Sequence, residues 1–276
     1  MSPRLLKISD MKKTTAGEKL FYLIRDELID LMGVSHARWS NLELLFEHIG
    51  GDTKYAGYIK GAVTVHIIRR LLRFWEVEKR LIADESLYVR KMADFIKREV
   101  FPGLDAGSVS LLSRAVIRAE AASFKPIKPQ VKANVIGERK AIRCYLCNRE
   151  LDKKAKEKDE SYLTFEHLWP TSIGGDSIED NLLPACKRCQ KVTKDTASWE
   201  WLNVHNLVLP SSPSDEALIS VSHPVRFAKH YLEAIRLADE SQLSLKDSFV
   251  RLGPMSHTLT HLQTGLPITF FDLRTV

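Results

Sequence analysis

The chain has 276 residues, of which 44% are hydrophobic and 28% charged, the proportions of an ordinary folded protein rather than a disordered one. No apolar run reaches the roughly 20 residues that a membrane-spanning helix needs, and the first residues lack the apolar segment of a secretory signal. We therefore expect a cytoplasmic protein without a membrane partner. A net charge of +6 permits a polyanionic partner without requiring one.

Residues 1–123 are predicted to form an α-helical domain. Thr15 and Glu18 have the spacing of a capping box, in which each side chain satisfies a backbone donor at the start of a helix. Apolar residues then recur at helical spacing in successive groups that could pack as a small bundle. The expected core positions are Leu20, Ile24, Leu28 and Leu31; Leu42, Leu45, Phe46 and Ile49; Val65, Ile68, Leu72, Trp75 and Leu81; Val89, Met92, Phe95 and Ile96; and Leu111, Leu112, Ala115, Val116 and Ala119.

The segment Lys125-Pro126-Ile127-Lys128-Pro129 interrupts the helical pattern. Proline removes a backbone donor and pushes the preceding residue toward extended geometry, so a helix cannot continue through this pair. We predict a basic linker over residues 124–139, followed by a small module at residues 140–195. Residues 196–276 are predicted as a C-terminal extension of mixed helix and short strand. Its expected apolar positions are Trp199 and Trp201, then Phe227, Tyr231, Ile235 and Leu237 on a helix, and Pro267, Ile268, Phe270 and Phe271 on a strand.

All four cysteines fall in two Cys-x-x-Cys pairs, Cys144/Cys147 and Cys186/Cys189, with 38 residues between the pairs. Two intervening residues let both sulfurs of a pair face one point, and zinc prefers four such ligands in a closed tetrahedral site. In a reducing compartment, paired cysteines are metal ligands more often than disulfides. We expect one structural Zn²⁺ that takes no part in chemistry. Four unligated thiols and a redox pair are the alternatives.

The sequence between and just after these pairs is more specific, and includes YLTFEHLWPTSIGGDSIEDNLLPACKRCQ. A β-prone run ends on Glu166-His167, a Gly174-Gly175 turn follows, and Asn181 precedes the second cysteine pair. In this order the features resemble the HNH family of nucleases. The resemblance implies a ββα-metal fold, in which a hairpin and a short helix surround one divalent ion. The expected fold class is therefore mainly α, with a small α+β module stapled by zinc.

The resemblance also implies a role for each residue. Hydrolysis of a phosphodiester needs a base to take a proton from water and a cation to offset charge on the leaving oxygen. By resemblance, His167 is the general base and Asn181 orients it and its loop. Glu166 and Gln190 would bind a catalytic Mg²⁺ or similar ion through oxygen atoms. Glu replaces the commoner Asp, and Gln replaces the commoner Asn or His. Of the nine histidines, only His167 lies in such a motif.

The expected partner is nucleic acid, with DNA favoured over RNA. The basic residues predicted to contact it are Lys128, Lys132, Arg139, Lys140, Arg143 and Lys194. A second basic cluster, around Arg69 and Arg80, is interpreted equally as a phosphate contact or as a solvated helix face. Because HNH modules are often fused to helical domains, analogy suggests a role in bacterial defence or a mobile element, with the helical domain docking a partner such as an ATPase. The alternative function is a zinc-knuckle nucleic-acid-binding or adaptor protein whose HNH site is inactive.

Overall fold

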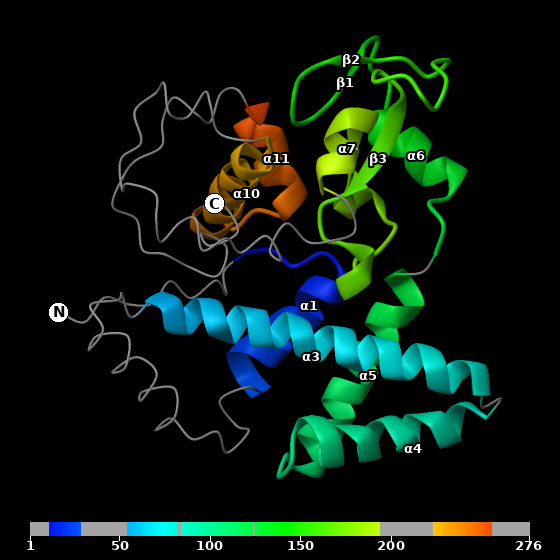
Figure 1. Cartoon of the computed structure of the whole chain (residues 1–276), viewed down its shortest axis with the longest axis vertical. Coiled ribbons are helices and arrows are strands. Elements are labelled where there is room, and N and C mark those ends of the chain that lie inside the picture. Colours follow the sequence, from blue (N-terminus) through cyan, green and yellow to red (C-terminus); the bar gives the residue numbers. More distant parts are fainter. Residues whose placement is uncertain (1–10, 29–53, 82–83, 124, 194–222, 256–276) are drawn as a thin grey trace.

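The computed structural model describes residues 11–28, 54–81, 84–123, 125–193 and 223–255 (Figure 1). This part of the chain is mostly helical and carries small two-stranded sheets in its middle third, which confirms the prediction of a mainly α chain with a small α+β part. None of its helices is long and apolar enough to cross a membrane.

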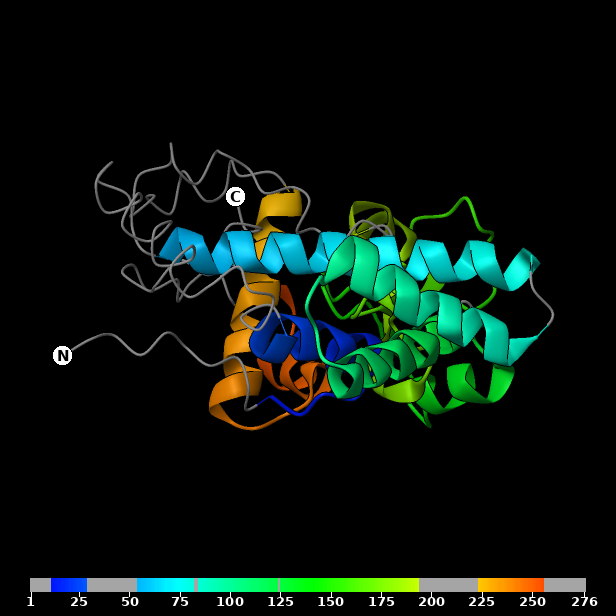
Figure 2. The same cartoon turned by 90° about the horizontal axis from the view of Figure 1, so that it is seen from below.

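Helices make up the N-terminal part. They are α1 (Ala16–Tyr22), its π-helical continuation η1 (Leu23–Leu28), α3 (Lys54–Leu81), α4 (Glu85–Phe95), its π-helical continuation η2 (Ile96–Val100), and α5 (Ala106–Ser123). The long helix α3 packs against α1, α4 and α5, which lie along one side of it (Figure 2). The predicted capping box is confirmed, because Glu18 N donates to Thr15 Oγ1 over 3.0 Å and Thr15 N donates to Glu18 Oε2 over 2.8 Å.

Most of the expected core positions in these helices are buried. Those confirmed are Leu20, Ile24, Leu28, Val65, Ile68, Leu72, Trp75, Met92, Ile96, Leu112, Val116 and Ala119. Two expectations are wrong: Leu81 is 73% exposed and Leu111 is 43% exposed. Leu81 is the last residue of α3, and Leu111 lies beside the buried stripe of α5 that runs through Leu112 and Val116. The expected core positions between residues 31 and 49 lie outside the described residues.

The predicted linker contains a helix, α6 (Pro129–Ile136), so the interpretation of this segment as a plain linker is corrected. Pro129 opens the helix instead of breaking it, because the first turn does not need the missing N–H and the fixed φ of proline suits a helix. Gly137, with a φ of 59°, ends it. α6 packs against β4 and the short 3₁₀ helix η4, so the segment covers the following module.

Two antiparallel strand pairs follow. β1 (Ile142–Arg143) pairs with β2 (Glu150–Leu151), and β3 (Leu163–His167) pairs with β4 (Leu182–Cys186). The loop between β3 and β4 includes the 3₁₀ helices η3 (Thr171–Ile173) and η4 (Glu179–Asn181), and α7 (Lys187–Thr193) follows β4 directly. Since α7 contacts both strands of the second pair, a hairpin and a helix form one compact unit there.

Helix α1 packs closely against the loop between β3 and β4. A Cβ atom at Gly17 would lie 2.5 Å from the backbone carbon of Gly174, and one at Gly174 would lie 2.8 Å from Ala119 Cβ. Ala16 N also donates to Asp176 Oδ2 over 2.6 Å. Gly174 has a φ of +88°, which favours glycine independently of the packing. The predicted glycine turn is therefore also the contact between the helical part and the hairpin.

The C-terminal helices α10 (His223–Glu240) and α11 (Leu245–Leu252) pack against each other and against the same unit. Tyr231 Oη donates to Leu168 O over 2.9 Å, and Met255 N donates to Leu146 O over 2.7 Å. The helix predicted around Tyr231 and Ile235 is confirmed, with both residues buried. The predicted strand at residues 267–271 and the two tryptophans at 199 and 201 lie outside the described residues.

Replacing Gly17 by Ala should lower the free energy of unfolding by about 1–3 kcal/mol, the usual cost of overpacking, because the new Cβ meets backbone atoms that cannot move aside. Chemical denaturation followed by circular dichroism measures the change. Gly107→Ala in α5 is the matched control. A Cβ atom at Gly107 would meet a single atom within 4 Å, the side-chain oxygen Oδ1 of Asp105 at 3.0 Å, and no backbone atom. Equal stabilities for the two variants would contradict the close contact.

Candidate functional site

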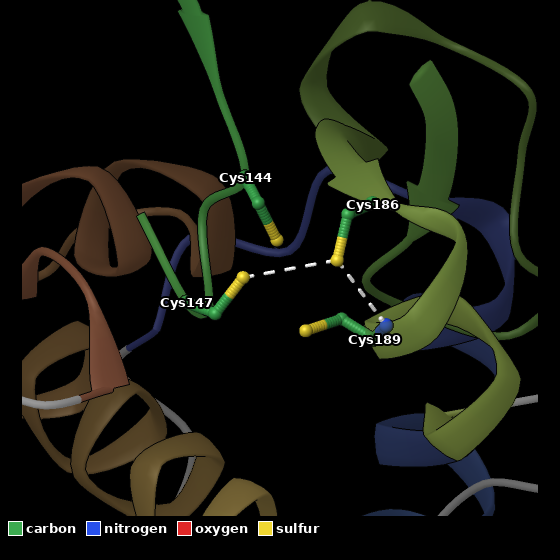
Figure 3. Close-up of side chains that lie close together, drawn as sticks. All are labelled: Cys144, Cys147, Cys186 and Cys189. Carbon is green, nitrogen blue, oxygen red and sulfur yellow. Dashed lines mark hydrogen bonds between the residues drawn. The ribbon is translucent and has the colours of Figure 1, made fainter. Parts of the chain in front are cut away.

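The sulfur atoms of Cys144, Cys147, Cys186 and Cys189 point toward one centre, within 4.8 Å of one another (Figure 3). The Sγ atoms of Cys147 and Cys186 are 3.7 Å apart. Four sulfurs placed tetrahedrally at the zinc–sulfur distance of about 2.3 Å are separated by about 3.8 Å. The cluster therefore has the size that one metal ion such as zinc requires. Among the described residues, no other group of three or more His, Cys, Asp or Glu side chains is close enough to hold a metal.

Two tight turns position the sulfurs. The first follows β1, where Asn148 N donates to Cys144 O over 2.9 Å and Asn148 adopts the left-handed conformation, with a φ of 60°. The second begins at Cys186, the last residue of β4, and places Cys189 in the first turn of α7. Cys189 N donates to Cys186 Sγ over 3.4 Å, and such a bond favours a negatively charged sulfur.

The thiols perturb one another strongly. Hydrogen bonds from Cys144 and Cys189 hold the pKa of the Cys147 thiol far below its ordinary value. The same hydrogen bonding raises the pKa of Cys144 to about 12 and also raises that of Cys189. Without a cation, the cluster would hold negative charge on Cys147 and keep Cys144 and Cys189 protonated. A bound Zn²⁺ would offset the charge of several thiolates and reverse this balance.

The hairpin separates the sulfur cluster from the predicted catalytic histidine. Cys186 pairs with Leu163 at one end of the β3–β4 ladder, whereas His167 pairs with Leu182 at the other end. Four residue steps of about 3.3 Å place these ends about 13 Å apart. A metal ion held by the cysteines would therefore lie at the opposite end of the hairpin from His167.

Asn181, which was predicted to orient His167 and its loop, is the last residue of η4 and directly precedes β4. Its side chain is buried, and its Oδ1 accepts a hydrogen bond from Trp169 N over 2.7 Å. Its Nδ2 donates to Trp169 O and to Asp176 O, each over 2.9 Å. A single amide thereby closes the loop that follows His167. Burial raises the pKa of the adjacent Asp176 carboxyl, which the bond from Ala16 N opposes.

Glu166 and His167 are neighbours in β3, and successive strand residues face opposite sides of a sheet. Glu166 is buried. The pKa of the Tyr145 phenol is raised well above its ordinary value, first by removal of the phenol from water and then by the charge of Glu166, so the two side chains lie near each other. His167 is half-buried and shares its side with Phe165. Gln190 is half-buried on α7, which packs against this hairpin.

The nitrogen Nε2 of His167 lies 3.0 Å from Ser177 Oγ, and Ser177 Oγ donates to Lys125 O over 2.6 Å. The sequence did not indicate Ser177 as a functional residue. No local pattern could have done so, because the carbonyl that holds its hydroxyl belongs to a residue 52 positions earlier.

The predicted nucleic-acid contacts differ in their surroundings. Lys128, Lys132, Arg139 and Lys140 are exposed, and Lys132 Nζ lies 5.8 Å from the ring centre of Phe165, on the His167 side of β3. Arg143 is also exposed but donates to Asn148 O over 3.2 Å and lies 3.9 Å from Glu150. The positive charge of Arg143 is therefore partly offset within the β1–β2 hairpin. Lys194 lies outside the described residues.

Comparison of the chain with protein-family models, with curated proteins and with solved structures finds no match.

Replacing Cys144 by Ser should abolish binding of one Zn²⁺ per chain and unfold the module, because metal binding at such sites is coupled to folding. Elemental analysis of the purified variant measures the metal, and protease resistance of residues 140–193 reports the fold. The control is Ser161→Ala, which changes a half-buried residue of the same module. Zinc retained at one equivalent per chain by the Cys144 variant would rule out the four-cysteine site.

Proposed function

We propose that this chain is a metal-dependent nuclease of the HNH type that hydrolyses phosphodiester bonds, in DNA in preference to RNA. The observation that carries the proposal is the position of His167. It ends the first strand of a hairpin, its loop is closed by Asn181, and a helix bearing Gln190 follows the second strand. This order of hairpin and helix is the one that the family resemblance implies.

In this proposal His167 takes a proton from the attacking water. An unperturbed histidine titrates near pH 6.5, so a neutral imidazole is abundant under cellular conditions. Asn181 keeps the loop fixed during the reaction, and the four cysteines hold a structural Zn²⁺ at the far end of the hairpin. Removal of that zinc would abolish activity through loss of fold.

Glu166 and Gln190 would hold the catalytic ion, which offsets the charge developing on the leaving oxygen. Mg²⁺ keeps several of its waters and takes only one or two carboxylates together with substrate phosphates, so a small set of protein ligands is sufficient. This assignment rests on the family resemblance, since Glu166 faces the side of β3 opposite to His167.

The substrate would approach along α6. Lys128 and Lys132 are exposed at this helix, and in the described part of the chain neither forms an ion pair. Phosphate contacts of this kind supply affinity without sequence preference. A role in bacterial defence or a mobile element, with the helical part docking a partner such as an ATPase, extends this proposal by family analogy.

His167→Ala should reduce metal-dependent cleavage by about 10²–10⁴-fold, the usual contribution of a general base, while DNA binding is retained. A plasmid-nicking assay with Mg²⁺, Mn²⁺ or Ni²⁺, run beside a binding titration, measures both. His66→Ala on the exposed face of α3 is the matched control and should cleave normally. A wild-type protein that binds DNA and never cuts it would instead support the inactive zinc-knuckle binding protein.

The double change Lys128→Gln and Lys132→Gln should weaken DNA binding and make the dependence of log K on log salt shallower. The slope should fall by about 0.9 for each DNA phosphate that these lysines neutralise in the wild type. Fluorescence titration at several salt concentrations measures this slope. The control is the double change Lys153→Gln and Lys154→Gln, which removes the same charge from exposed positions after β2. Identical slopes for the two double variants would exclude α6 as the DNA-binding surface.

A further inference from the structure

The hydroxyl of Ser177 connects His167 to a backbone carbonyl of the segment before α6. Ser177 Oγ lies 3.0 Å from His167 Nε2 and 2.6 Å from Lys125 O. A serine hydroxyl has a single proton to donate, and a carbonyl oxygen can only accept. The Ser177 hydroxyl therefore donates its one hydrogen bond to Lys125 O.

The hydrogen bond from Ser177 to Lys125 O determines the direction of the hydrogen bond between Ser177 and His167. Since the Ser177 hydroxyl donates its hydrogen bond to Lys125 O, its oxygen can only accept from His167. Nε2 of the imidazole must therefore carry a hydrogen. In a neutral imidazole the second nitrogen is then unprotonated. The basic lone pair of His167 is thus at Nδ1.

We propose that Ser177 is a positioning residue that fixes the tautomer of His167, with Nδ1 as the atom that accepts the proton from water. The catalytic part of this inference rests on the proposed nuclease function. The tautomer part does not, because it follows from the hydrogen bonds alone.

The loop around Ser177 is built to keep this arrangement. Asp176, immediately before it, is held through its carboxylate by Ala16 N and through its carbonyl by Asn181 Nδ2. Lys125 precedes Pro126, which disfavours helical geometry and leaves the Lys125 carbonyl outside any helix ladder. Pro126 therefore does more than interrupt the helical pattern. It leaves the Lys125 carbonyl available as an acceptor for the loop beside His167.

The first test measures the tautomer without any need for activity. Nitrogen-15 NMR of the full-length protein labelled at histidine, at about pH 8 and so above the ordinary histidine pKa of about 6.5, distinguishes the Nε2–H form from the Nδ1–H form. His167→Ala assigns the signal. The wild type should show the Nε2–H form, and Ser177→Ala should move His167 toward a mixture. Ser177→Thr keeps the hydroxyl and should restore the wild-type spectrum, whereas Ser161→Ala should not change it.

The second test measures the catalytic consequence. Ser177→Ala should lower kcat by about 10–100-fold, by analogy with the loss of a residue that orients a metal-ligating histidine, with little change in KM. Ser177→Thr should recover most of the rate. A wild-type tautomer and rate in Ser177→Ala would overturn the proposal. An Nε2–H form that depends on Ser177, in a protein that cuts no nucleic acid, would instead uphold the hydrogen-bond assignment and refute the nuclease function.

Discussion

The buried amide of Asn181 is the interaction on which the arrangement of the candidate site depends. Its oxygen and nitrogen satisfy both backbone groups of Trp169 and the carbonyl of Asp176. Trp169 lies two residues after His167, and Asp176 lies one residue before Ser177. The amide thus fixes the loop beside each partner of the histidine hydrogen bond. A buried polar group whose bonds are all made gives a unique geometry, whereas one left with a missing bond costs stability.

The sulfur cluster and the histidine lie at opposite ends of the β3–β4 hairpin. Cys186 and the sulfur cluster occupy one end of β4, and Leu182, the strand partner of His167, occupies the other. In the proposed nuclease, zinc at the first end would stabilise the fold without competing for the water or the phosphate at the second. Removing the metal and removing the histidine should therefore produce different defects, the first in folding and the second in the chemical step.

Much of this organisation could be predicted from the sequence because the signals are local. The Thr15–Glu18 capping box, the helical periodicity around Ile68 and Trp75, and the spacing of the cysteines each report on neighbouring residues. Pro129 was misinterpreted because the same residue that ends one helix is also favoured in the first turn of another. The exposure of Leu81 was missed because periodicity does not say where a helix extends beyond its neighbours.

The features that could not be predicted join distant parts of the chain. Gly17 packs against Gly174, and the carbonyl of Lys125 accepts a hydrogen bond from the hydroxyl of Ser177. Neither contact can be predicted from the residues that are neighbours in sequence. The same limit applies to the side of β3 that each residue faces. Alternation places Glu166 and His167 on opposite sides, but only the packed structure shows that Tyr145 lies near the first and α6 near Phe165, beside the second.

The contacts made by the C-terminal helices have a consequence for the order of events during synthesis. The last cysteine is residue 189, yet Tyr231 and Met255 supply hydrogen bonds to Leu168 and Leu146 in the module. A growing chain that has just exposed its fourth cysteine still lacks these supports, and their wide separation in sequence makes them slow to form. The module reaches its final packing only after residue 255 has left the ribosome, 66 residues after the last cysteine. The finished surroundings of both the sulfur cluster and the histidine site thus require the chain as far as residue 255.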